Sequence, residues 1–207
     1  MNRDAPSTRF REVVHLVRHP LKSVDSRYNG GHIANFEKYH KCNVDTSSVP
    51  ASNALAVTLH HWVAWNLFVE ATSSKRLRIE DFVADPANVG RSLCADLLKG
   101  RLDNGTWYDA TPCPSDEHFT LAASRLSPND HSNHTVKVGG FTWITLYEQD
   151  PQTTQMAQLM ALRYGYDIHQ EELYVDPMKH KESCTFNNDG RWRCQLVSVL
   201  LPEEALS

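Results

Sequence analysis

Apolar residues follow two different periods along the first part of the chain. Residues 12–17 are mostly apolar and β-branched, a pattern typical of a strand buried on both faces of a parallel sheet. Pro20 suits the first turn of a following helix, which we expect to reach about Tyr28. Apolar residues at helical spacing then predict a long amphipathic helix over 52–70.

The rest of the chain repeats this alternation. Asp85 can cap a helix and Pro86 fits its first position, so we expect that helix to run to about Leu98 and stop at 99–100. Similar signals predict a strand at 76–79, a largely irregular stretch at 101–142 with a short helix at 117–125, a helix at 152–164 ended by Gly165, and a hairpin at 183–200. Strands alternating with helices indicate an α/β fold with a mostly parallel sheet.

Composition agrees with one globular domain over residues 1–207. The chain is 41% hydrophobic and 22% charged, which excludes a disordered or collagen-like protein. No run of about 18 apolar residues is present, so we expect no membrane span. The first residues lack the apolar stretch of a signal peptide. The sequence as written therefore predicts a cytoplasmic protein, and a longer N-terminus would favour the Golgi lumen or the secretory pathway.

Charge is distributed unevenly. The net charge is 21 minus 25, or −4. Residues 1–41 contain eight Lys or Arg and four Asp or Glu, a local net charge of +4. This favours a local anion site near the N-terminus, although solvated arginines on a helix face explain it as well. Basic and aromatic residues are not interleaved, so no nucleic-acid partner is expected.

The five cysteines contain no CxxC pair, which argues against a zinc knuckle. Cys184 and Cys194 bracket a turn signal, Asn188-Asp189-Gly190, so pairing of their strands can bring the two sulfurs together. Glycosylation sequons begin at Asn104 and Asn133 and fit the same oxidising compartment. Two unpaired thiols and two chance sequons are the alternative.

Arg18 follows the first predicted strand and stands before a helix start. A guanidinium beside backbone N–H groups is suited to binding a phosphate. Ser26, eight residues later, lies about two turns into the helix and can add a hydroxyl donor. Alternatively, Arg18 is an ordinary strand-end residue in a surface ion pair.

This segment resembles the 3′-phosphate-binding segment of sulfotransferases that use 3′-phosphoadenosine 5′-phosphosulfate (PAPS). Arg18, Pro20 and Ser26 occupy that family's R-x-P motif and its serine. Three further segments are similar to the family in its order, and the resemblance spans about residues 12–168. They are the Glu-Asp and Asp-Pro segment at 77–86, a glycine-containing loop before a Trp at 137–143, and a last helix at 152–166.

The resemblance implies a three-layer, P-loop NTPase-like α/β fold and transfer of a sulfuryl group from PAPS to a hydroxyl of a carbohydrate or small acceptor. PAPS is the implied co-substrate and no metal is implied. Arg18 and Ser26 would bind the 3′-phosphate. Lys137 and Gly139 are further candidates for the same phosphate, and the alternative for Lys137 is a solvated loop lysine.

The sequence also departs from the family. The family's 5′-phosphosulfate loop precedes the R-x-P segment, and only 17 residues precede Arg18 here. The usual general base belongs to that missing region, so no catalytic residue is assigned. Ile79 stands where the family has an adenine-contacting Tyr, and His15 lies inside the strand as an expected core residue. Two explanations stay open: part of a longer sulfotransferase, or a noncatalytic module that binds PAPS or its product, adenosine 3′,5′-bisphosphate (PAP).

The eleven histidines suggest metal binding, but their spacing does not support it. Adjacent helical residues such as His60 and His61 point about 100° apart. His131 and His134 have no obvious carboxylate partner. We therefore expect no metal. On the long helix, Trp65 lies four residues after His61 and three after Trp62. This set fits either an acceptor cleft or, more commonly, the core.

Overall fold

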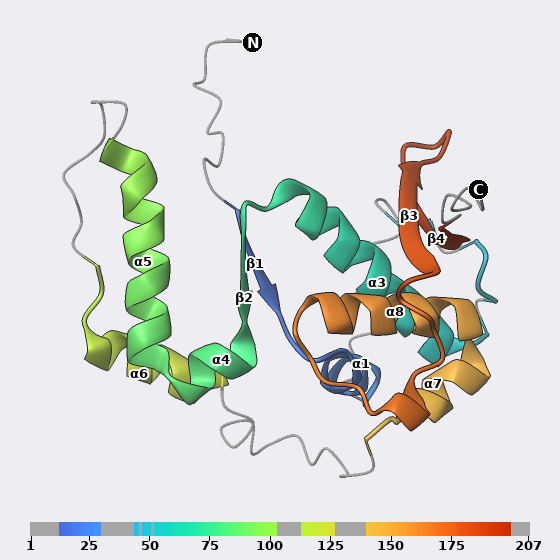
Figure 1. Cartoon of the computed structure of the whole chain (residues 1–207), viewed down its shortest axis with the longest axis horizontal. Coiled ribbons are helices and arrows are strands. Elements are labelled where there is room, and N and C mark those ends of the chain that lie inside the picture. Colours follow the sequence, from blue (N-terminus) through green and yellow to red (C-terminus); the bar gives the residue numbers. More distant parts are fainter. Residues whose placement is uncertain are drawn as a thin grey trace, which may run out of the picture. The chain divides into compact units, whose positions relative to one another are not determined.

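A computed structural model describes residues 13–29, 44–45, 47–50, 52–102, 113–126 and 140–199, excluding the side chains of 97–102. The chain divides into two compact units, each discontinuous in sequence (Figure 1). Unit 1 comprises Met1–Val17 and Glu70–Ser132, and unit 2 comprises Arg18–Val69 and Asn133–Ser207.

Unit 1 contains a small parallel sheet of two strands. Strand β1, Val14–Val17, pairs with β2, Lys75–Arg78, from Val14 opposite Lys75 to Val17 opposite Arg78. The strand prediction is confirmed, but its predicted burial on both faces is wrong. His15 and Val17 are 3% and 0% exposed, whereas Leu16 between them is 56% exposed. Because successive side chains of a strand point to opposite faces, one face of β1 is covered and the other is open.

The described part of unit 1 also contains the end of α3 (Ala54–Thr72) and the helices α4 at Ile79–Ala84, α5 at Pro86–Leu102 and α6 at Asp116–Leu126. The predicted cap is confirmed, because Asp85 Oδ1 accepts a hydrogen bond from Asn88 N at 3.3 Å. The predicted stop at 99–100 is wrong, because α5 continues through Gly100. A glycine inside a helix costs only about 1 kcal/mol, which continued helix formation can exceed.

Helices α5 and α6 pack closely through a glycine and an aromatic ring. A Cβ at Gly90 would lie 2.4 Å from the ring of Phe119, so only glycine allows this approach. Phe119 also meets Phe82 edge to face, with ring centroids 6.5 Å apart. A disulfide between Cys94 and Cys113 links α5 to the segment before α6. The cysteine spacing did not predict this bond.

Unit 2 contains most of the helical structure and the second sheet (Figure 1). Its elements are α1 at Pro20–Asn29, most of α3 at Ala54–Thr72, α7 at Trp143–Gln149, α8 at Pro151–Arg163, the 3₁₀ turn η2 at Gln170–Glu172, β3 at His180–Phe186 and β4 at Trp192–Ser198. The predicted helices at 20–28, 52–70 and 152–164 are confirmed with small shifts of their ends, whereas α7 was not expected.

Helix α3 is buried on all sides over its first three turns, so its predicted amphipathic character is wrong. Every residue from Leu55 to Ala64 is buried, including two adjacent histidines. A helix that is apolar around its whole circumference belongs in the interior rather than on the surface. Asn53 caps this helix by accepting a hydrogen bond from Ala56 N at 3.0 Å.

Helix α8 has well-defined ends that the sequence encodes locally. Asp150 accepts a hydrogen bond from Thr153 N at 3.0 Å, and Pro151 takes the first helical position. At the other end Gly165 has φ 78°, and its N–H reaches Leu162 O at 3.0 Å. Tyr166 N reaches Ala161 O at 2.9 Å, which completes a Schellman motif.

The predicted C-terminal hairpin and its disulfide are confirmed. Strands β3 and β4 are antiparallel, and Cys184 and Cys194 are direct cross-strand partners joined by a disulfide. Asn187 N donates to Arg191 O at 2.8 Å, which places the cysteines at a non-hydrogen-bonded position three pairs away, where facing side chains are closest. Gly190, with φ 72°, closes the turn.

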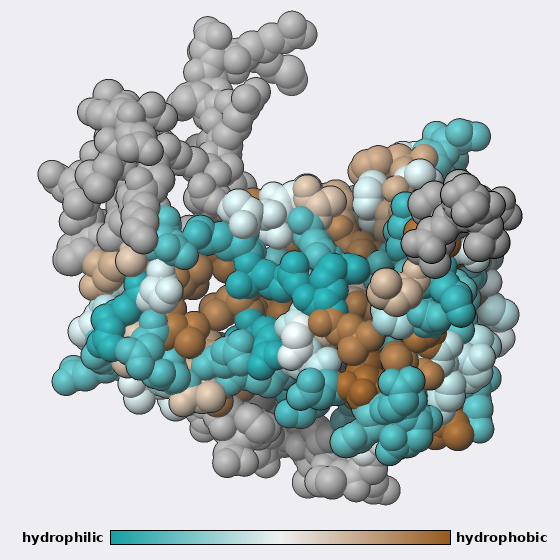
Figure 2. All heavy atoms as spheres, in the orientation of Figure 1, coloured by the Kyte–Doolittle hydropathy of each residue, from teal (hydrophilic) through white to brown (hydrophobic). Residues whose placement is uncertain are grey.

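The architecture is a mixed α/β fold with a small parallel sheet and an antiparallel hairpin. A three-layer, P-loop NTPase-like arrangement stays a prediction. Among the described residues, no helix combines the length and the apolar character needed to cross a membrane. Hydrophilic and apolar residues are interspersed over the face drawn in Figure 2.

Candidate functional site

The start of α1 is held by contacts within unit 2. His19 Nδ1 accepts a hydrogen bond from Leu21 N at 3.3 Å, so the imidazole caps the helix. Its ring also lies edge-on to Tyr166, with centroids 5.0 Å apart. Ser23 Oγ, on the inner face of α1, donates to Arg18 O at 3.5 Å. The backbone of Arg18 is therefore fixed relative to the first turn of the helix.

The outer face of α1 carries a cation and a hydroxyl. Pro20, Ser23 and Val24 are buried. Lys22 and Ser26 are exposed, and residues four apart lie on the same helix face. Helical side chains tilt toward the N-terminus of their helix, so the side chains of Lys22 and Ser26 point toward the end of α1 that the half-buried Arg18 precedes. No acidic residue occupies the first turn of α1, so no carboxylate of that turn competes with a bound anion for the backbone N–H groups.

The structure does not test the predicted phosphate contacts. Lys137 and Gly139 lie outside the described residues, as do Asn104 and Asn133 of the two sequons. His15 is buried, as expected for a core residue. Two of the four candidate phosphate ligands, Arg18 and Ser26, are therefore placed on one described segment.

The histidines of α3 belong to the interior. His61 and Trp62 are each 2% exposed, which supports the core interpretation, and Trp65 is half-buried. The part of the chain that the structure describes contains no group of three or more His, Cys, Asp or Glu side chains arranged to hold a metal ion.

A buried polar network in unit 2 was not anticipated. Asp45 is 5% exposed, and its carboxylate accepts hydrogen bonds from Ser47 N and from Asn187 Nδ2, each at 3.0 Å. Hydrogen bonds from the side chain and backbone of Ser47 lower the pKa of Asp45 to about 2. The Asp45 N–H donates to Trp192 O at 2.9 Å. Asp45 therefore connects its own segment to both the turn and a strand of the hairpin.

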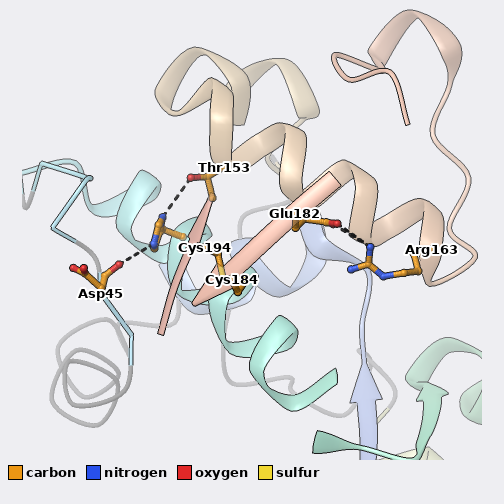
Figure 3. Close-up of a disulfide and its surroundings, with 7 residues drawn as sticks. Asp45, Thr153, Arg163, Glu182, Cys184 and Cys194 are labelled. Carbon is orange, nitrogen blue, oxygen red and sulfur yellow. Dashed lines mark hydrogen bonds and ion pairs between the residues drawn. A yellow bond between two sulfur atoms is a disulfide. The ribbon is translucent and has the colours of Figure 1, made fainter. Parts of the chain in front are cut away.

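The same network continues into two helices. His60 Nε2 lies 3.0 Å from Asp45 O, and His60 Nδ1 lies 3.5 Å from Thr153 Oγ1. Thr153 Oγ1 in turn donates to Asp150 Oδ2 at 2.6 Å. Figure 3 shows the two imidazole contacts as dashed lines ending at Asp45 and Thr153. Asp150-Pro151 has the local sequence signal of a helix cap. The contact between Thr153 and His60 joins positions 93 residues apart and has no local signal.

Comparisons of the chain with protein-family models, with curated proteins and with solved structures find no match.

Proposed function

We propose that this chain binds the 3′-phosphate of PAPS, or of its product PAP, as part of a sulfotransferase that acts on a hydroxyl of a carbohydrate or small acceptor. The observation that carries the proposal is the arrangement around α1. Arg18 immediately precedes a capped helix start that lacks a first-turn acid, and Ser26 is on the exposed face two turns later. A forked cation beside a helix N-terminus is suited to a phosphate dianion.

Each residue has a defined part in this proposal. The Arg18 guanidinium donates two parallel hydrogen bonds to phosphate oxygens, and Ser26 adds a neutral hydroxyl donor. Both residues bind the nucleotide and fix its position. They do not act on the transferring sulfuryl group, because the 3′-phosphate is remote from it. When bound, PAPS supplies the activated sulfuryl group. The transfer itself needs donors around the 5′-phosphosulfate and a base for the acceptor proton. No such residues are assigned in this chain.

Titration calorimetry with PAP tests the binding step. We expect Arg18→Ala to weaken binding by about 10- to 100-fold, the range for losing a charged hydrogen-bonding partner. Arg125→Ala is the matched control, because Arg125 is an exposed arginine at the end of α6. Adenosine 5′-monophosphate, which lacks the 3′-phosphate, is the control ligand. The wild-type chain should bind PAP more tightly than this ligand, and Arg18→Ala should lose that difference in affinity. Equal binding of PAP by the wild type and Arg18→Ala contradicts the site.

An assay with PAPS and carbohydrate acceptors separates the two forms of the proposal. Sulfuryl transfer that depends on Arg18 supports an enzyme. PAP binding that depends on Arg18, without transfer, supports the noncatalytic binding module. Absence of PAP binding contradicts both.

A further inference from the structure

His60 occupies a closed position among three segments of unit 2. Its side chain comes from α3 and is 2% exposed. The carbonyl oxygen of Asp45 can only accept a hydrogen bond, so His60 Nε2, 3.0 Å away, carries the hydrogen. His60 Nδ1 faces Thr153 Oγ1 at 3.5 Å. The single hydroxyl hydrogen of Thr153 is already donated to Asp150 Oδ2, so Nδ1 is the nitrogen that takes up an added proton.

Charged groups of both signs face this imidazole. Asp150, at the start of α8, and Asp45 favour its protonation, whereas Arg193 on β4 opposes it. Burial has the largest effect and lowers the pKa of His60 below its ordinary value. Enclosure therefore favours the neutral imidazole, and a proton binds more readily when the ring reaches water.

The hairpin is fastened to α3 through Asp45. Residues 44 and 45 run beside β4, where Val44 forms a parallel bridge with Trp192 and Asp45 N donates to Trp192 O. Asn187, in the hairpin turn, donates to the Asp45 carboxylate. His60 then joins Asp45 to α3. The Cys184–Cys194 disulfide ties the two hairpin strands together. The hairpin also contacts the helices through the Arg163–Glu182 ion pair, at 3.0 Å, and through the rings of Phe68 and Trp192.

We propose that His60 is an acid-sensitive latch, whose protonation releases the β3–β4 hairpin and residues 44–45 from helices α3 and α8. An imidazolium enclosed at this position loses hydration that Asp150 only partly replaces. Opening restores that hydration, so mild acid shifts the population toward the open form. The sign follows from linkage: the open form binds more protons below pH about 6.5, so closure weakens as the pH falls. This device does not depend on the proposed nucleotide site.

Hydrogen exchange of the full chain at pH 7.5 and pH 5.0 tests the latch. The exchange rates are first corrected for the intrinsic pH dependence of exchange. The opening equilibrium constant of the amides in 44–50 and 180–199 should then be larger at pH 5.0, by a factor of at most about 30. This is the ratio for a histidine of pKa about 6.5 that ionises only in the open form. His60→Gln keeps an N–H donor for Asp45 O but cannot ionise, so it should lose this response. His180→Gln, a half-buried histidine on β3, is the matched control and should keep the response.

A second variant keeps the test decisive if His60→Gln fails to fold. Asp150→Asn preserves a helix-capping side chain but removes the carboxylate that favours the charged imidazole. It should bring the acid response of the same two peptides closer to the limit of about 30-fold. Equal exchange of wild-type protein at both pH values overturns the latch. So does an acid response that persists in His60→Gln, or one that Asp150→Asn reduces.

Discussion

The two units differ in how their interiors are held together. Among the described residues, unit 1 contributes three buried apolar side chains, Val17, Phe82 and Ala123, and the remaining buried apolar residues all lie in unit 2. In unit 1 a disulfide joins α5 to the segment before α6, and Gly90 makes a close contact with Phe119. Unit 2 has the enclosed helix α3 and a buried polar network. Both units contain a disulfide, so they differ in the size of the described apolar core and in the buried polar groups of unit 2, which hydrogen-bond to one another.

The largest expected effect comes from the core of unit 2. Leu59 is 0% exposed on α3, so Leu59→Ala should lower the free energy of unfolding by about 3 kcal/mol through lost burial and a residual cavity. Urea unfolding followed by far-UV circular dichroism measures this change. Leu121→Ala, on α6 of unit 1, is the control, since Leu121 is 53% exposed and should change stability by less than about 0.5 kcal/mol. Equal losses would remove the contrast between the units.

The disulfide of unit 1 should have the next largest effect. Cys94 and Cys113 are 19 residues apart, and closing a loop of that size stabilises a fold by about 3 kcal/mol. The double variant Cys94→Ser/Cys113→Ser should therefore lose protection from hydrogen exchange over residues 116–126. Exchange over 151–163 in unit 2 is the internal control. A loss spread evenly over both helices would mean that the bond does not act locally.

The contact between α5 and α6 tests steric closeness in unit 1. Gly90→Ala should cost about 2 kcal/mol, because the new methyl group overlaps the Phe119 ring. Combining it with Phe119→Leu, which replaces the rigid ring, should recover part of the loss. Ser92→Ala, at an exposed position of the same helix, is the control. Thermal unfolding compares the variants, and a stabilised Gly90→Ala would show that helix propensity outweighs the overlap.

The smallest effect concerns the polar network of unit 2 and depends on pH. Because the pKa of Asp45 is lowered to about 2 in the folded chain, its ionised form stabilises the fold above pH about 4, and this contribution is lost as the pH falls. Between pH 5 and pH 3 the loss should be about 1 kcal/mol. Asp45→Asn should lose this part of the acid sensitivity in urea unfolding. Asp189→Asn, an exposed carboxylate of the hairpin turn, should retain it.

Local signals predicted the elements well because their causes are local. Pro20, the Asp85-Pro86 pair and Gly165 mark helix ends through capping and backbone geometry that involve neighbouring residues only. Helix α7 has the same kind of signal, since Thr142 accepts a hydrogen bond from Thr145 N at 3.2 Å, but its apolar pattern is too short to predict it. The end of α5 and the existence of α7 were the parts that the sequence analysis missed.

Burial was less predictable than secondary structure. The apolar run at β1 is compatible with either one or two covered faces, and Leu16 shows that one face is open. The apolar residues of α3 suggested one buried stripe, whereas neighbouring segments enclose even the polar His60 and His61. Which faces are covered depends on other parts of the chain, so the sequence of one element does not decide it.

The sequence alone indicated most of the strands and helices, that Cys184 and Cys194 could pair across a turn, and that Arg18 and Ser26 form a candidate phosphate site. These depend on neighbours in the chain or on a short motif. Only the tertiary structure decided that Cys94 bonds to Cys113, that Gly90 receives Phe119, and that His60 joins Asp45 to Thr153. These contacts link distant positions, and folding selects them through the packing of whole elements.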